Sequence, residues 1–246
     1  VAKTTDNERD LEIVRRLLKQ INYFELNLSS EDKTDILFKT LIKSTNADWV
    51  VCHQYSNFLL NRGNYDAAIN WIERAIKKNP KSATLKHTKG NIYYRQGMDL
   101  KLCGSEYEAE KKFDDARKFF ALSRVGADPS EHGYVTHLDM LLKLIDSSGD
   151  ECHKADLYSE GIHIYKEGFR SVSKDRFNLL TEKKFTRFRS DRGMIEYLVD
   201  KIETGLSRNK ASVYAISFLA DHYYSKDDYE RSLEILELGR KINREG

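Results

Sequence analysis

Proline is nearly absent from this chain, with two residues in 246, Pro80 and Pro129, where about 5% is usual in proteins. Proline and glycine are the strongest punctuation of turns. So few breakers, in a sequence with 33% charged residues, favour long helices over a strand-rich fold with frequent turns. The apolar residues Leu11, Val14 and Leu18 recur at helical spacing. We therefore expect an all-α chain.

Charge, cysteine content and hydropathy argue against several classes of protein. The chain has 41 Lys+Arg and 39 Asp+Glu, a net charge of +2, so we do not expect a dedicated nucleic-acid binder. No apolar run approaches the roughly 18 residues of a membrane span, and no signal peptide opens the chain, so no membrane partner is expected. Three cysteines without framework spacing indicate reduced thiols in a cytoplasmic protein.

Residues 49–80 give the clearest local pattern. Apolar and small residues fall into two helices, separated by the turn sequence Asn-Arg-Gly-Asn at 61–64. Two antiparallel helices pack tightly only if small residues sit where they cross. Gly63 allows the tight turn, and Pro80 ends the second helix.

These residues resemble the tetratricopeptide repeat, a 34-residue helix–turn–helix unit. Counted from Trp49, the family's small residue, turn glycine, aromatic, two alanines and proline fall on Ser56, Gly63, Tyr65, Ala68, Ala75 and Pro80. Cys52 and Leu59 depart from the usual Trp and Tyr. The resemblance implies an α-α superhelix, a solenoid of antiparallel helix pairs with a concave inner surface.

The whole chain can be divided on this basis. We expect N-terminal helices over residues 1–48 and repeat units over 49–82, 83–129, 130–173, 174–208 and 213–246. The middle repeats are irregular: extra sequence lies between Met98 and Glu106, and the fourth pair would be Arg176–Phe188 and Met194–Leu206. The chain starts without Met and stops inside a helical pattern, so we expect a fragment of a larger protein.

No catalytic motif stands out. There is no glycine-rich phosphate loop, no His-Glu-x-x-His and no Gly-x-Ser-x-Gly. The dipeptides Cys52-His53 and Cys152-His153 each offer one zinc ligand at most, because adjacent helix residues point about 100° apart. We expect no enzyme, no cofactor and no metal.

The resemblance also implies a groove. The pattern His-x-x-x-Asn occurs once in each of the first two units, at positions that line the concave face in the repeat family. The partner-binding residues expected there are His53, Asn57, His87, Asn91 and Arg95. The alternative is that polar residues simply solvate a concave face. Chaperone-binding members hold a terminal carboxylate with a Lys at the position of His87, which weighs against a chaperone-tail clamp.

A secondary basic patch is expected at Lys183, Lys184, Arg187 and Arg189, interleaved with aromatic residues. Such a run can contact phosphate or an acidic partner. The alternative is a helix with Phe177, Leu180 and Phe188 inward and the charges outward.

The tyrosines fall into two groups, those expected to pack in the core and those expected to be accessible. Tyr93, Tyr223 and Tyr229 occupy packing positions of the repeat, whereas Tyr94, Tyr214 and Tyr224 fall on the other helix face, within reach of a partner.

The stretch Ala109–Phe120, followed by residues 128–135, resembles the C-terminal repeat arms of STAND-type signal-transducing NTPases. These include prokaryotic antiviral sensors and vertebrate innate-immunity proteins. The resemblance implies a protein-interaction module that senses a partner or holds an NTPase inactive. Its partner would be another protein or a domain of the same full-length chain. A generic repeat scaffold and a peptide-binding regulator remain alternatives.

Overall fold

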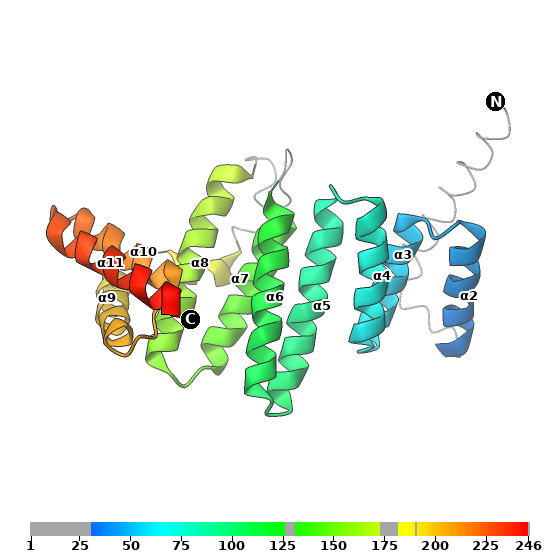
Figure 1. Ribbon diagram of the computed structural model, residues 1–246, viewed down its shortest axis with the longest axis horizontal. Coiled ribbons are helices and arrows are strands. Elements are labelled where there is room, and N and C mark those ends of the chain that lie inside the picture. Colours follow the sequence, from blue (N-terminus) through cyan, green and yellow to red (C-terminus); the bar gives the residue numbers. More distant parts are fainter. Residues whose placement is uncertain (1–30, 126–130, 173–181, 190, 246) are drawn as a thin grey trace. The chain divides into compact units, whose positions relative to one another are not determined.

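The computed structural model describes residues 31–125, 131–172, 182–189 and 191–245 (Figure 1). Within these ranges every regular element is a helix and none is a strand, and consecutive helices pack in pairs. The expectation of an all-α fold of helix pairs is confirmed. The stripe containing Leu11 and Leu18 lies outside the described residues.

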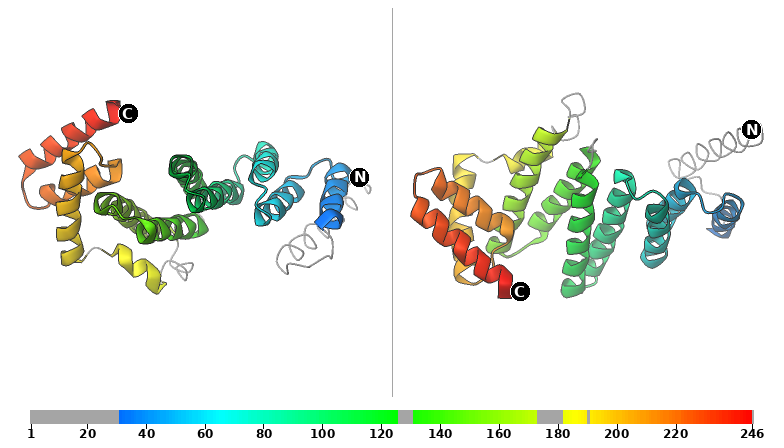
Figure 2. Two further views of the ribbon diagram at one scale, coloured as in Figure 1. Left: turned by 90° about the horizontal axis from the view of Figure 1, so that it is seen from below. Right: turned by 45° about the horizontal axis from the view of Figure 1, so that its top comes forward.

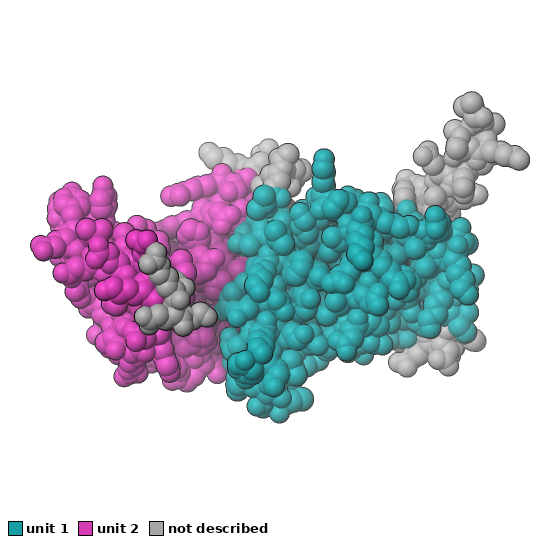
Figure 3. Space-filling view, viewed as in Figure 1, with its two compact units in different colours: residues 1–133 teal, residues 134–246 magenta. Residues whose placement is uncertain are grey.

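The chain divides into two compact units, residues 1–133 and residues 134–246 (Figure 3). This division falls inside the helix Glu131–Ser147. The expected passage from N-terminal helices to repeats at residue 48 stays a prediction. The expected division into five repeat units stays a prediction. Each compact unit is described by itself below.

Unit 1 contains helices α2 to α6. Their bounds are Glu31–Ser44, Trp49–Asn61, Tyr65–Lys78, Ala83–Leu102 and Glu106–Arg124. Polar residues start three of them, because a side-chain oxygen accepts a backbone N–H that the helix leaves unsatisfied. These caps are Asp48, Asn64 and Ser82. The turn between α3 and α4 uses Gly63 at a φ of +70°, a backbone conformation that glycine adopts without steric cost.

Helix α2 shares a core with α3 and α4. The Phe38 ring of α2 lies 5.1 Å from Tyr55 and 5.2 Å from Phe58, both on α3. The same cluster includes Ala68 and Ile72 of α4. At the α3–α4 crossing, buried Ser56 donates to the carbonyl oxygen of Ala68 at 2.8 Å. Helices can approach this closely only where side chains are small.

Glycines facing phenylalanine rings join α5 to α6, which lie side by side in Figures 1 and 2. A Cβ on Gly97 would sit 2.6 Å from the Phe113 ring, and one on Gly90 would sit 2.8 Å from the Phe120 ring. Both rings are fully buried. The sequence between Met98 and Glu106 that was read as extra lengthens α5 to Leu102, after which the chain turns into α6.

Polar contacts in unit 1 join residues that are 34 or 35 positions apart in the chain. Arg95 donates to the Asn61 side chain at 3.0 Å, and the Tyr65 hydroxyl donates to Asp99; each pair is separated by 34 residues. The His53–Thr88 contact spans 35 residues. Consecutive helix pairs therefore stack with equivalent positions next to each other.

Unit 2 contains most of α7, followed by α8, the 3-10 helix η2, and α9 to α11. The bounds are Glu131–Ser147, Glu151–Ser171, Lys183–Phe188, Arg192–Ser207, Val213–Tyr224 and Tyr229–Glu245. Helix α8 packs against η2, α9 and α10. Its buried Glu160 lies 2.9 Å from His137 of α7. In the α10–α11 pair, Ser232 donates to the carbonyl oxygen of Ala220 at 2.9 Å, as Ser56 does to Ala68 in unit 1.

The α-helix expected over Arg176–Phe188 is wrong at its end. Residues 183–188 form a 3-10 helix, and Phe177 and Leu180 lie outside the described residues. A 3-10 helix has about three residues per turn, so side chains three apart eclipse each other. Phe185 and Phe188 consequently point the same way, and both are buried. The second helix of that pair forms as α9, within two residues of its expected ends.

The glycine–phenylalanine contacts predict that replacing glycine by alanine has opposite effects on stability at two positions. Gly97→Ala gains helix propensity, but it forces the buried Phe113 ring to move, and overpacking typically costs about 1–3 kcal/mol. We expect a net loss of stability. Gly193→Ala is the matched control, because Gly193 is also helical and its nearest neighbour is 3.8 Å from the added Cβ. It should stabilise by up to about 1 kcal/mol. Urea unfolding checks both, and equal effects would contradict the packing described.

Candidate functional site

The first His–Asn pair expected in the groove, His53 and Asn57, is only partly accessible to solvent. His53 is only 8% exposed. Its Nε2 atom lies 2.8 Å from the Thr88 hydroxyl of α5 and 3.2 Å from the Asn57 side-chain amide. The expectation that His53 faces an open concave surface is wrong, because the imidazole ties α3 to α5. Asn57 remains partly exposed beside it.

The second pair has a different environment. The His87 ring lies 5.8 Å from the Phe120 ring and 6.4 Å from the His132 ring. Burial, and secondarily the nearby His132, lowers the pKa of His87 to about 4. A neutral imidazole cannot supply the positive charge that a carboxylate clamp requires. This weakens the case for a chaperone-tail clamp at His87.

Arg95 and Asn91 complete the expected groove residues. Asn91 is partly exposed, and Arg95 is exposed and donates to Asn61. The structure therefore does not place two equivalent His–Asn pairs side by side on one open face. Whether Asn57, Asn91 and Arg95 bind a partner stays a prediction.

The secondary basic patch is largely neutralised inside unit 2. Lys184 lies 2.9 Å from Asp139 and 3.0 Å from Glu182. Hydrogen bonding to Asp139 raises the pKa of Lys184. Arg189 donates to the Tyr165 hydroxyl at 3.4 Å, and Lys183 is exposed.

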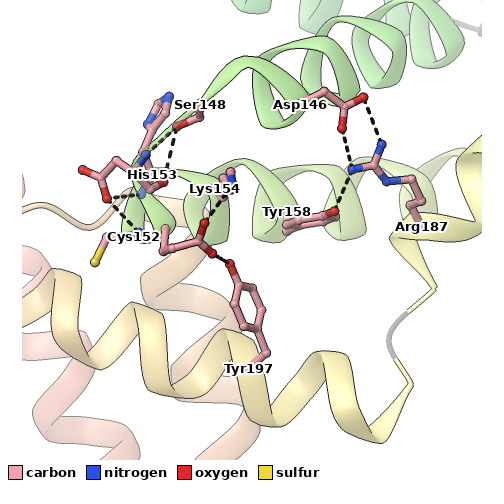
Figure 4. A network of polar contacts seen from close by, with 10 residues as sticks. Asp146, Ser148, Cys152, His153, Lys154, Tyr158, Arg187 and Tyr197 are labelled. Carbon is pink, nitrogen blue, oxygen red and sulfur yellow. Dashed lines mark hydrogen bonds and ion pairs between the residues drawn. The ribbon is translucent and has the colours of Figure 1, made fainter.

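Arg187 makes the strongest of these contacts. Its guanidinium lies 2.8 Å from one Asp146 oxygen and 3.1 Å from the other, and donates to the Tyr158 hydroxyl at 2.9 Å (Figure 4). The hydrogen bonds to Asp146 raise the pKa of Arg187. Meanwhile the Phe188 ring covers Gly161 of α8, where a Cβ would come within 2.0 Å of it. The basic run thus fastens η2 to α7 and α8.

The start of α8 carries a further polar network (Figure 4). Asp150 caps the helix by accepting from the backbone N–H of Cys152 at 2.8 Å. Glu151 accepts from Lys154 at 2.8 Å and from the Tyr197 hydroxyl of α9 at 2.6 Å. Burial, and then the bond to Glu151, raises the pKa of Tyr197.

A hollow of about 560 Å³ lies beside this network, lined by residues of α7, α8, η2 and α9. Its charged side chains are Asp146, Glu151, Lys154 and Arg187, and each contacts an oppositely charged member of the set. The network therefore acts as a joint between helices, with its charges already balanced.

A second hollow in unit 2, between α8 and α10, has a different character. Its volume is about 380 Å³. Lys166 and Arg170 of α8 line it, facing Tyr214 and Phe218 of α10. The sequence analysis did not single out the α8 residues, although it placed Tyr214 within reach of a partner. The spacing of His163, Lys166 and Arg170 along one helix face was the available signal.

The described residues hold no group of three or more His, Cys, Asp or Glu side chains arranged for a metal ion. Cys52 and Cys152 are buried free thiols. None of the described helices is long and apolar enough to cross a membrane.

No protein-family model matches the chain, and no curated protein sequence matches it.

The lowered pKa of His87 predicts a pH effect. In the unfolded chain this histidine titrates near 6.5, whereas the folded value is about 4. Between these values the unfolded state binds more protons, so stability is full above about pH 6.5 and falls towards pH 4. His87→Gln should make the fall in melting temperature over this range shallower. Parallel profiles for the variant and the original protein would contradict this.

The Arg187 contacts predict local loosening of η2. Arg187→Ala leaves Asp146 and Tyr158 without that partner, so η2 should open more often. The Phe185 amide, which donates to the Glu182 carbonyl, should exchange with solvent at least about fivefold faster, equivalent to about 1 kcal/mol. Lys183→Ala, in the same element but exposed, is the control and should leave exchange unchanged. Hydrogen-exchange mass spectrometry measures both.

Proposed function

We propose that this chain is a protein-interaction module built of stacked helix pairs. One observation carries the proposal: a stripe of large apolar side chains on α11 stays open to solvent. Tyr229, Leu233 and Leu236 are 55%, 59% and 48% exposed, and Tyr224 of α10 is 64% exposed beside them. The Tyr224 and Tyr229 rings lie 5.2 Å apart. We call these four residues the α11 stripe.

The three α11 residues of the α11 stripe share one helix face. Positions 229, 233 and 236 are spaced by four and three residues, so they line up along α11. Ser232 and Ile235, on the adjoining face of α11, are buried in the unit. Helical repeats need a polar outer face where a stack ends in solvent, and clustered exposed apolar residues mark interaction sites. The α11 stripe therefore suits a covering partner.

Acidic residues beside the α11 stripe indicate the charge that a partner would carry at one edge of the contact. Glu230 and Glu237 follow the stripe along α11, and both are exposed. Neither makes an ion pair with any residue that the structure describes. A partner surface that is apolar at its centre and basic at this rim complements them, since rim charges steer association.

The tetratricopeptide-type reading is supported by the contacts between residues 34 apart, Asn61 with Arg95 and Tyr65 with Asp99. On this basis we propose the finer function that the resemblance of Ala109–Phe120 suggests. The chain would be the partner-sensing or autoinhibitory arm of a STAND-type NTPase in antiviral defence or innate immunity. The covering partner would then be another protein or a domain of the same full-length chain.

The finer function can be tested by sequence alone. The complete reading frame that contains this chain should encode Gly-x-x-x-x-Gly-Lys-Ser/Thr, a phosphate-binding loop, upstream of Val1. A complete frame without it would overturn the NTPase assignment and leave the interaction module, in the form of a generic scaffold.

The interaction module itself predicts a mutational effect. Replacing both Leu233 and Leu236 by Glu puts charge into the centre of the α11 stripe. Partner proteins recovered with the tagged chain should fall at least about tenfold, as expected for loss of central contacts. Leu102→Glu is the control, because Leu102 is also exposed but lies on α5. Equal recovery with both variants, at unchanged helix content, would contradict the proposal.

A further inference from the structure

We propose that the hollow between α8 and α10, here called the α8–α10 groove, binds an acidic peptide segment. The ligand would place a carboxylate side chain on the α8 wall and a neighbouring large apolar side chain on the α10 wall. This inference rests on the proposed function, since it names a second kind of contact that the module makes. It involves neither the α11 stripe nor the expected groove residues of unit 1.

The α8 wall carries two cations without a counter-ion. Lys166 and Arg170 are exposed and four residues apart, so their side chains leave the same face of the helix. Neither forms a hydrogen bond or ion pair with the residues that the structure describes. Both line the groove. Two adjacent cations hold a carboxylate by charge-assisted hydrogen bonds, and the planar guanidinium of Arg170 can do so with two parallel N–H donors.

Other basic side chains of unit 2 do have counter-ions. Lys184 and Arg187 lie in the same unit, and each contacts carboxylates there. Lys166 and Arg170 stay unpaired although two carboxyl groups line the same groove. Unit 2 therefore leaves positive charge at the α8 wall of this groove, whereas it cancels positive charge around η2.

The two groove carboxylates restrict where a ligand charge can sit. Glu167 accepts a hydrogen bond from the Tyr134 hydroxyl of α7 at 3.2 Å, so it is held by another helix. Asp221 lines the α10 side and is exposed. A ligand carboxylate near Asp221 would be repelled, and one on the α8 wall would be attracted. Asp221 can accept a backbone N–H of the peptide.

Aromatic groups supply the apolar half of the groove. Tyr214 and Phe218 are partly buried on the α10 wall, and Ile162 is a buried lining residue from α8. The His163 ring, which also lines the groove, lies 5.4 Å from the Tyr214 ring. Aromatic rings beside a few placed polar groups are typical of binding sites.

The size of the groove favours a peptide. Its volume of about 380 Å³ is within the usual range of about 300–1,000 Å³ for small-ligand sites. That space accommodates a few side chains of an extended segment. A folded partner could occupy it only by inserting such a segment.

The test uses two capped peptides with an uncharged dye. The probe has the sequence Gly-Glu-Leu-Glu-Phe-Gly, and the matched control replaces both Glu by Gln. Fluorescence anisotropy with the whole chain should show saturable binding of the probe that weakens as salt is raised. The Gln peptide should bind at least about tenfold more weakly. Equal binding of the two peptides, or no binding of the probe, would overturn the proposal.

Variants locate the binding. The double variant Lys166→Gln, Arg170→Gln should reduce affinity for the probe by about tenfold, at an unchanged melting temperature. Lys39→Gln, Lys43→Gln on α2 is the matched control, because it removes the same charge from two residues four apart in unit 1. It should bind like the original chain. Equal losses in both variants would mean non-specific attraction and overturn the groove.

Two further measurements distinguish peptide binding in the α8–α10 groove from the α11 contact and from nucleic-acid binding. The variant with Leu233 and Leu236 both replaced by Glu should bind the probe like the original chain. Normal probe binding together with lost partner recovery in this variant means that the α11 contact and the groove are separate sites. Partner recovery without peptide binding would overturn only the groove. A single-stranded DNA oligomer that displaces the probe from the original chain, but not from the Lys166, Arg170 variant, would assign the groove to nucleic acid instead.

Discussion

Close approach between a glycine backbone and an aromatic ring is the contact on which the α5–α6 pair depends. In unit 1 the buried rings of Phe113 and Phe120 lie on Gly97 and Gly90. Moving seven residues forward on α5 corresponds to moving seven residues back on α6. The two contacts therefore fix both the rotation and the sliding of one helix against the other, since interiors packed at crystal-like density admit few alternatives. In unit 2, Gly161 under Phe188 makes one contact of the same kind between α8 and η2.

Pairing of charges decides which basic side chains are available to a partner. The sequence draws attention to residues 183–189, where cations are densest. In the folded chain Lys184 pairs with Asp139, 45 residues away in sequence, and Arg187 pairs with Asp146, 41 residues away. Lys166 and Arg170 on α8 have no such counter-ion among the described residues. Local charge density therefore indicates an element that docks onto acidic neighbours as readily as one that binds a ligand.

The ends of α3 and α4 were predictable from the sequence, whereas the 3-10 helix at residues 183–188 and the orientation of several helix faces were not. Local signals such as Asn64 and Gly63 set the bounds of α3 and α4, because caps and turns involve only near neighbours. Which side chains are buried depends on helices that arrive from elsewhere. Tyr94 was expected on an accessible face and is buried, whereas Tyr229 was expected to pack and is exposed. The closure of His53 by Thr88 has the same cause, since its partner belongs to the next helix pair.

The polar ties between residues 34 apart have a consequence for changes in chain length. A single residue inserted within α4 would rotate all that follows by about 100° and break the Asn61–Arg95 and Tyr65–Asp99 contacts together. The α5–α6 tip lies beyond both ties, and nothing comes within 4 Å of a Cβ placed on Gly104. Insertions and deletions that spare the stack should therefore accumulate at this tip. There the two helices can lengthen or shorten together without disturbing their neighbours.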